Sequence, residues 1–105
     1  MAAATAYLFG GTAEKIGGAI KNHLGSFAPV CCDGAKTSCA LKVGEMAASA
    51  VKSGLLALNG CIIRSTDGIV DESAEQTMRN LAVLSRQGLT GLDPAILDIM
   101  LHKQA

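Results

Sequence analysis

Aromatic residues are nearly absent from this 105-residue sequence: Phe and Tyr make up 3% of it, and Trp does not occur. Half of the residues are nevertheless apolar, so a core must be built from Ala, Leu, Ile, Val and Met. Such residues suit closely packed helices better than a β-sandwich or barrel, which needs more β-branched and aromatic side chains. The length is that of one domain at most. Together with this composition, it predicts an all-α fold of four to five helices.

An excess of charge of either sign is also lacking, since nine basic residues balance nine acidic ones. The chain has no basic block and no basic patch interleaved with aromatics, which excludes nucleic acid as a predicted partner. A neutral chain with a mean hydropathy of +0.35 is instead expected to associate with other protein.

Long apolar runs are missing too. The longest stretch without charge, residues 1–13, contains Gly10 and Gly11 and is shorter than the ~20 apolar residues that cross a bilayer. No basic residue precedes its apolar part, as one would in a secretory signal. We therefore expect no membrane partner and a cytoplasmic location, where cysteines more often bind metal or act in catalysis than form disulfides.

Apolar residues at spacings of three and four predict the helices. They are expected at residues 2–9, 13–24, 35–58, from a cap near residue 72 to about 87, and 95–102. The first has no N-cap and is expected to be the end of a longer helix. The longest carries small residues such as Ala50 and Gly54 on an apolar side that includes Val43, which predicts close helix crossings. Residues 61–72 have some strand character but are short.

Capping residues predict where these helices begin and end. Gly25 is expected to end the helix that begins at residue 13, and the glycines at 17 and 18 are expected to face another backbone. Ser73 and Gln76 fit a capping box. The predicted caps are Thr12, either Asp71 or Ser73, and Asp93 followed by Pro94 at the first helical position.

Three of the four cysteines lie within "PVCCDGAKTSCALKV" (residues 29–43), at the start of the longest predicted helix. A disulfide is one interpretation, although the adjacent Cys31 and Cys32 would strain if bridged. A zinc site made of Cys32, Cys39, Cys61 and His23 is a second, without the usual ligand spacing. Small apolar packing is the third, and it is the expected role of Cys31 and Cys61.

Position distinguishes Cys32 and Cys39 from the other two. Cys32 is expected in the loop before the helix and Cys39 about one turn inside it, where free N–H groups and the helix dipole stabilise a thiolate. Lys36 adds a positive charge between them. Thiolates hold iron–sulfur clusters, so these two cysteines are the predicted metal and cofactor ligands, with a further ligand coming from elsewhere.

The motif "CDGAKTSCALKV", preceded by "GGTAEKIGGAIKN" and followed by "STDGIVDESAEQTMRNL" and "LDIML", resembles the C-terminal part of the L-cysteine desulfidase family, within the iron–sulfur serine-dehydratase-alpha-like group. The resemblance covers essentially the whole chain. It implies a larger all-α catalytic domain with a 4Fe–4S cluster held by three cysteines. It also implies elimination of sulfide from L-cysteine to give pyruvate and ammonia, or of water from L-serine. Cys32 and Cys39 match the last two cluster cysteines.

The same resemblance implies that the remaining cluster cysteine and the catalytic base, also a cysteine, lie upstream and have no counterpart here. Residues 1–105 are therefore expected to be a C-terminal portion that is inactive alone and pairs with the upstream part of the enzyme or with a second copy. Asp33, Lys36 and the loop 64–68 are candidates for contacts to the small amino-acid substrate, although ordinary turn roles explain them. The alternative is a stand-alone helical interaction module with structural cysteines and no metal.

Overall fold

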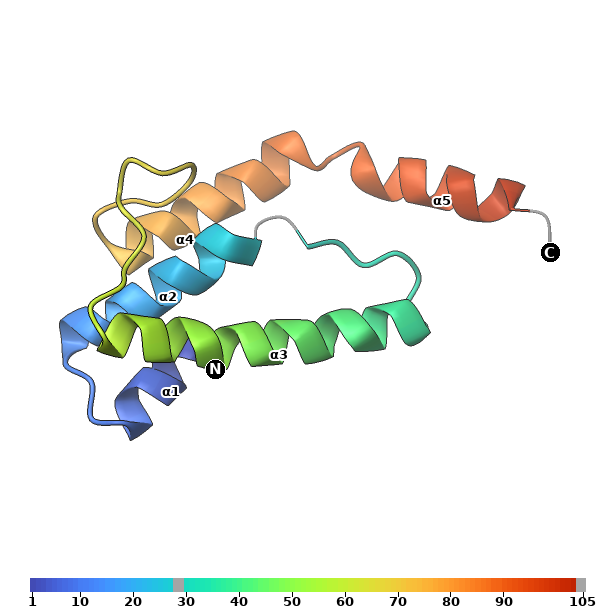
Figure 1. The fold of residues 1–105 in the computed structure, drawn as a ribbon. Helices are drawn as coiled ribbons and strands as arrows, with labels where there is room; N and C mark the ends of the chain where they lie inside the picture. Colours follow the sequence, from blue (N-terminus) through green and yellow to red (C-terminus); the bar gives the residue numbers. More distant parts are fainter. Residues whose placement is uncertain (28–29, 104–105) are drawn as a thin grey trace.

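The structure, a computed structural model, describes residues 1–27 and 30–103, which form helices and irregular segments with no strand among them. The elements in chain order are α1 (Ala2–Leu8), α2 (Ala13–Phe27), α3 (Thr37–Leu58), α4 (Ala74–Val83), the π-helical turn η1 (Leu84–Gly88) and α5 (Leu92–His102). The all-α prediction is confirmed. In Figure 1, α2 lies between α3 and α4, α1 packs at one end of α3, and α5 extends beyond the opposite end.

The core is small and lies where α1, α2 and α3 meet. Ile16, Leu58 and Ile62 pack there against five buried alanines. These are Ala2, Ala6, Ala19, Ala50 and Ala57. A Cβ atom added to Gly54 of α3 would lie 2.8 Å from the Cβ of Thr5 and 3.0 Å from the carbonyl oxygen of Ala2. The close helix crossing predicted from the small residues of the long helix is therefore confirmed.

Helix α2 begins where the sequence predicts but ends later. The Thr12 hydroxyl accepts a hydrogen bond from the Lys15 N–H (3.4 Å). Gly25, predicted to end the helix, lies inside it, and a Cβ there would come within 2.7 Å of Val70. The prediction is wrong because this glycine makes room for a side chain. Likewise, residue 18 faces the Ile62 side chain instead of a backbone, and space around residue 17 is open.

The C-terminal helices follow the predicted order with shifted boundaries. Ser73 caps α4, its hydroxyl accepting a hydrogen bond from the Gln76 N–H (3.0 Å), as predicted. Helix α4 changes to the π-helical turn η1 after Val83, and η1 continues to Gly88, close to the predicted end near residue 87. The predicted cap at Asp93 is wrong: α5 begins at Leu92 with Gly91 as N-cap, which places Asp93 and Pro94 in the first turn. Proline is tolerated there because the first N–H groups of a helix have no helical partner.

Asn22 joins α2 to the irregular segment after α3. Its side chain is almost fully buried, its amide nitrogen donates to the Cys61 carbonyl (2.7 Å), and its amide oxygen accepts from the Ile63 N–H (2.7 Å). The Asn22 amide thus makes two backbone hydrogen bonds of the kind that a neighbouring strand would make. This explains how residues with strand character remain an ordered single segment.

Apolar side chains of α5 and of the first half of α3 are exposed. Leu41 and Val43 of α3 are 68% and 67% exposed, and Leu97, Ile99 and Leu101 of α5 are exposed as well. The predicted apolar side of the long helix is therefore covered only in its C-terminal half. The radius of gyration, 15.8 Å, exceeds the ~13 Å of a compact chain of this length. Within the described ranges, no helix has both the length and the hydrophobicity required to cross a membrane.

Candidate functional site

The cysteine loop, residues 30–36, leads into the N-terminus of α3, at the end of the molecule that lies away from α1 (Figure 1). Helix α3 begins at Thr37, two residues later than predicted, because Gly34 and Ala35 have φ values of 125° and 50°. Ala35 is the only non-glycine residue with a positive φ in the part of the chain that the structure describes. These two left-handed residues turn the loop back toward the first turn of α3.

Cys32 and Cys39, the two predicted ligands, lie side by side. Their Sγ atoms are 3.3 Å apart, with Cys32 exposed and Cys39 half-buried in the first turn of α3. This distance is longer than the ~2.05 Å of a disulfide bond, and all four cysteines are free thiols. The pair is open to solvent at a helix N-terminus, where a metal or a cluster could reach both sulfur atoms.

The surroundings of Cys32 favour its thiolate. The backbone N–H of Gly34 contributes most to lowering the pKa of the Cys32 thiol, followed by the neighbouring Cys39 thiol and the N–H of Ala35. Hydrogen bonds from N–H groups stabilise the charged form of sulfur, and the same groups tune cluster-bound thiolates. The unusual backbone at residues 34–35 therefore has an electrostatic consequence as well as a geometric one.

Asp33 and Lys42 form an ion pair directly beside the two sulfur atoms. The Lys42 ammonium donates to Oδ1 of Asp33 (2.7 Å) and to the carbonyl oxygen of Cys31 (3.1 Å). The same Oδ1 accepts from the Ser38 hydroxyl (3.3 Å) and from the Cys39 thiol (3.5 Å). The hydrogen bond from Lys42 lowers the pKa of Asp33, and the carboxylate in turn raises the pKa of Lys42.

The structure does not assemble the zinc quartet. Among the described residues, no three His, Cys, Asp or Glu side chains are arranged to hold a metal ion, so the quartet hypothesis is wrong. Cys61 is exposed and contributes its carbonyl to Asn22, and His23 stacks on Phe27 with ring centroids 5.7 Å apart. Burial lowers the pKa of His23, and the positive amino terminus adds to the effect. In this structure His23 is therefore a packing residue of α2.

The remaining predicted candidates lie outside the thiol pair. The Lys36 side chain is exposed, and its backbone forms the N-cap of α3. Residues 64–68 form turns between α3 and α4, with Thr66 hydrogen-bonded to Asp67 (3.1 Å). In Figure 1 this segment lies at the opposite end of the molecule from the cysteine loop. Only Asp33 of these candidates contacts the thiols.

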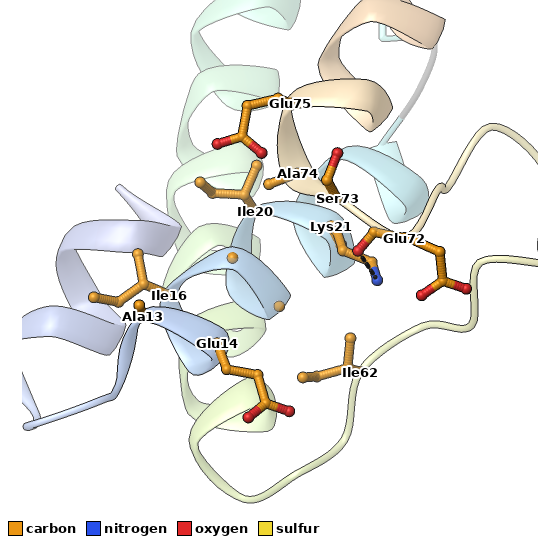
Figure 2. Close-up of a pocket in the computed structure, with 12 residues that line it drawn as sticks. Ala13, Glu14, Ile16, Ile20, Lys21, Ile62, Glu72, Ser73, Ala74 and Glu75 are labelled. Carbon is orange, nitrogen blue, oxygen red and sulfur yellow. Dashed lines mark hydrogen bonds between the residues drawn. The ribbon is translucent and has the colours of Figure 1, made fainter.

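A groove of about 740 Å³ elsewhere in the described part of the chain contains no cysteine. It lies between the first half of α2 and the start of α4, as Figure 2 shows, with Glu14, Glu72 and Glu75 around it. The Lys21 ammonium is held there by the Glu72 carbonyl (3.1 Å). Size alone therefore does not identify the chemistry of this chain, and the thiol pair remains the candidate site.

Sequence reasoning missed two polar residues that organise the structure. Lys42 follows Cys39 by three residues on α3, and this spacing places both side chains on one helix face. Asn22 continues the three-residue spacing of Ile16 and Ala19, so its burial could have been inferred from that stripe.

A family model and several curated relatives match this chain. The family model described as "Serine dehydratase alpha chain" matches residues 1–98. The UPF0597 protein of Desulforapulum autotrophicum is 52% identical over 101 residues, which are 96% of this chain and 23% of that relative. The UPF0597 proteins of Alkaliphilus oremlandii (48% identical) and Porphyromonas gingivalis (44%) are matched over 90% and 93% of this chain and over 22% and 23% of their own lengths.

The chain thus spans about a quarter of the length of the curated relatives it matches. No solved structure shows significant similarity to it. The family match, which covers all the helices except the end of α5, is reached independently of the cysteine geometry. The chain belongs to the serine dehydratase alpha chain family.

Proposed function

We propose that residues 1–105 form the C-terminal portion of the catalytic domain of an iron–sulfur lyase, in which Cys32 and Cys39 supply two thiolates to a 4Fe–4S cluster. The observation that carries this proposal is the pair of free thiols 3.3 Å apart at the N-terminus of α3. The donor set fits, because clusters bind thiolates and are tuned by N–H groups such as those of Gly34 and Ala35.

The complete enzyme would convert L-cysteine and water to sulfide, pyruvate and ammonia, or eliminate water from L-serine to give pyruvate and ammonia. A bound cluster supplies a Lewis acid for the departing sulfur or oxygen. The residues of this chain hold that cluster and keep positive charge and N–H donors near its sulfur ligands. They do not supply the base that removes the α-proton, so the chain alone would be inactive. A reducing, cytoplasmic compartment would keep both thiols available.

The partner we propose is the upstream part of the same enzyme, with a second copy of the chain as the alternative. The curated relatives are about four times as long as this chain. The thiol pair lies at the end where Leu41, Val43 and Leu101 are exposed, so a partner covering these side chains would also reach the cluster. That partner would bring the third cluster ligand and the base.

The test is anaerobic co-expression of this chain with the upstream three quarters of the Desulforapulum autotrophicum relative, followed by iron and sulfide analysis and a visible spectrum. The complex should contain a cluster and release pyruvate from L-cysteine or L-serine. Cys32→Ser and Cys39→Ser should each remove the cluster absorbance, whereas Cys61→Ser should retain it. If no combination binds iron and a Cys32→Ser, Cys39→Ser double variant folds like the parent, the chain is the interaction module instead.

A further inference from the structure

We infer that Lys42 is the positioning residue that holds Cys32 against Cys39, an inference that rests on the proposed role of these two cysteines. The ammonium of Lys42 bonds to Asp33 (2.7 Å) and to the carbonyl of Cys31 (3.1 Å), which are the residues on either side of Cys32. One side chain on α3 therefore fixes both neighbours of the exposed cysteine.

Helix α3 links Lys42 to the second thiol, that of Cys39. Cys39 and Lys42 are three residues apart on α3, so the two side chains leave the same face of a rigid element. The Asp33 carboxylate closes the arrangement, because its Oδ1 also accepts from the Ser38 hydroxyl and from the Cys39 thiol. Loop and helix are thus cross-linked by charge-assisted hydrogen bonds around the two sulfur atoms.

The cysteine loop depends on the hydrogen bonds of Lys42 because the loop backbone itself favours other conformations. Ala35 has a φ of 50°, which costs free energy in a residue with a Cβ atom, and Cys32 is exposed instead of packed. The backbone hydrogen bond from Ala40 to the Lys36 carbonyl (3.1 Å) fixes the start of α3 but not residues 31–33. Without Lys42, the loop would spend most of its time with the sulfur atoms apart.

Lys36 provides a matched control for charge. It lies between the two cysteines in sequence and carries the same charge, but its side chain is exposed at the N-cap of α3. If a nearby positive charge were all that the thiols require, Lys36→Met and Lys42→Met would have equal effects. If the geometry of the loop matters, only Lys42→Met should have an effect.

The experiment measures whether both thiols bind one arsenic atom. Phenylarsine oxide reacts with two thiols to form two As–S bonds, and the two thiol protons leave with its oxygen as water. This chain is titrated under reducing, anaerobic conditions in a Cys31→Ser, Cys61→Ser background, so that only Cys32 and Cys39 can react. Because chelation depends on the effective concentration of the second thiol, Lys42→Met should weaken binding by roughly tenfold or more. Lys42→Arg should restore most of the binding, and Lys36→Met should stay within about twofold of the parent.

Far-UV circular dichroism and the visible cluster assay separate the possible outcomes. If Lys42→Met lowers the helix content, Asp33→Ala removes the same link from the loop side and should weaken chelation without unfolding α3. Chelation by Lys42→Met or Asp33→Ala that equals the parent's would overturn the inference, whatever the co-expressed complex binds. If Lys42→Met loses chelation while the co-expressed parent complex acquires no cluster, the positioning role stands and the proposed function fails.

Discussion

Asn22 offers the sharpest test of what stabilises this fold. Its amide satisfies the Cys61 carbonyl and the Ile63 N–H at 2.7 Å each, and its nitrogen also approaches the Ser53 carbonyl (3.5 Å). Asn22→Ala would leave two partly buried backbone groups without partners, each costing ~1–3 kcal/mol. Because water reaches part of this segment, we expect a total loss of about 2–4 kcal/mol. That is a large share of the ~5–15 kcal/mol by which domains of this size are stable.

The measurement is thermal unfolding followed by far-UV circular dichroism, in which Asn22→Ala should lower the midpoint by roughly 10–20 °C. Asn59→Ala is the matched control: Asn59, the C-cap of α3, is exposed, and its side-chain amide donates to the Leu55 carbonyl one turn earlier (2.8 Å). Exposed substitutions usually change stability by less than ~0.5 kcal/mol. Equal midpoints for Asn22→Ala and Asn59→Ala would show that the polar clamp is not a principal source of stability.

Three further predictions concern packing, pH and a buried hydroxyl. Gly54→Ala should cost roughly 1–3 kcal/mol by urea unfolding because α1 crosses at that point, whereas Gly44→Ala, with open space around it, should gain up to about 1 kcal/mol. Since burial lowers the pKa of His23, the unfolded chain binds the proton more readily; stability should fall as pH drops below about 6.5, and His23→Phe should remove this loss. Thr77→Val should destabilise by about 1–2 kcal/mol in the same urea assay, because the Thr77 hydroxyl is fully buried and accepts from the Asp71 N–H (3.0 Å).

The helices could be predicted from local signals, and the errors arose where distant residues decide. Thr12 and Ser73 cap their helices as the sequence indicates, because an N-cap depends only on residues one turn away. Gly25 has the composition of a helix end but lies inside α2 to accommodate Val70, which is 45 residues away in sequence. No property of Gly25 itself distinguishes these two roles.

The candidate site also has one feature that could be predicted from local sequence and one that could not. The proximity of Cys32 and Cys39 follows from a loop entering a helix, and it could be anticipated from sequence. The link through Lys42 could not, because it depends on the loop turning back at Ala35, a residue that rarely adopts a positive φ. A sequence pattern that predicts an ordinary turn at Asp33-Gly34 therefore hides the contact that joins loop to helix.

Helix α3 connects two regions with different physical requirements. Its C-terminal half, with Ala50, Gly54 and Ala57, is buried against α1 and α2 and stabilises the fold. Its N-terminal half carries Cys39 and Lys42 and remains largely exposed. Substitutions in the first region should therefore reduce thiol chelation only in proportion to the fraction unfolded. Substitutions at Lys42 should reduce chelation while the unfolding midpoint stays near that of the parent, because an exposed ion pair contributes little to stability. Measuring thiol chelation and the unfolding midpoint on each variant therefore distinguishes loss of the site from loss of the fold.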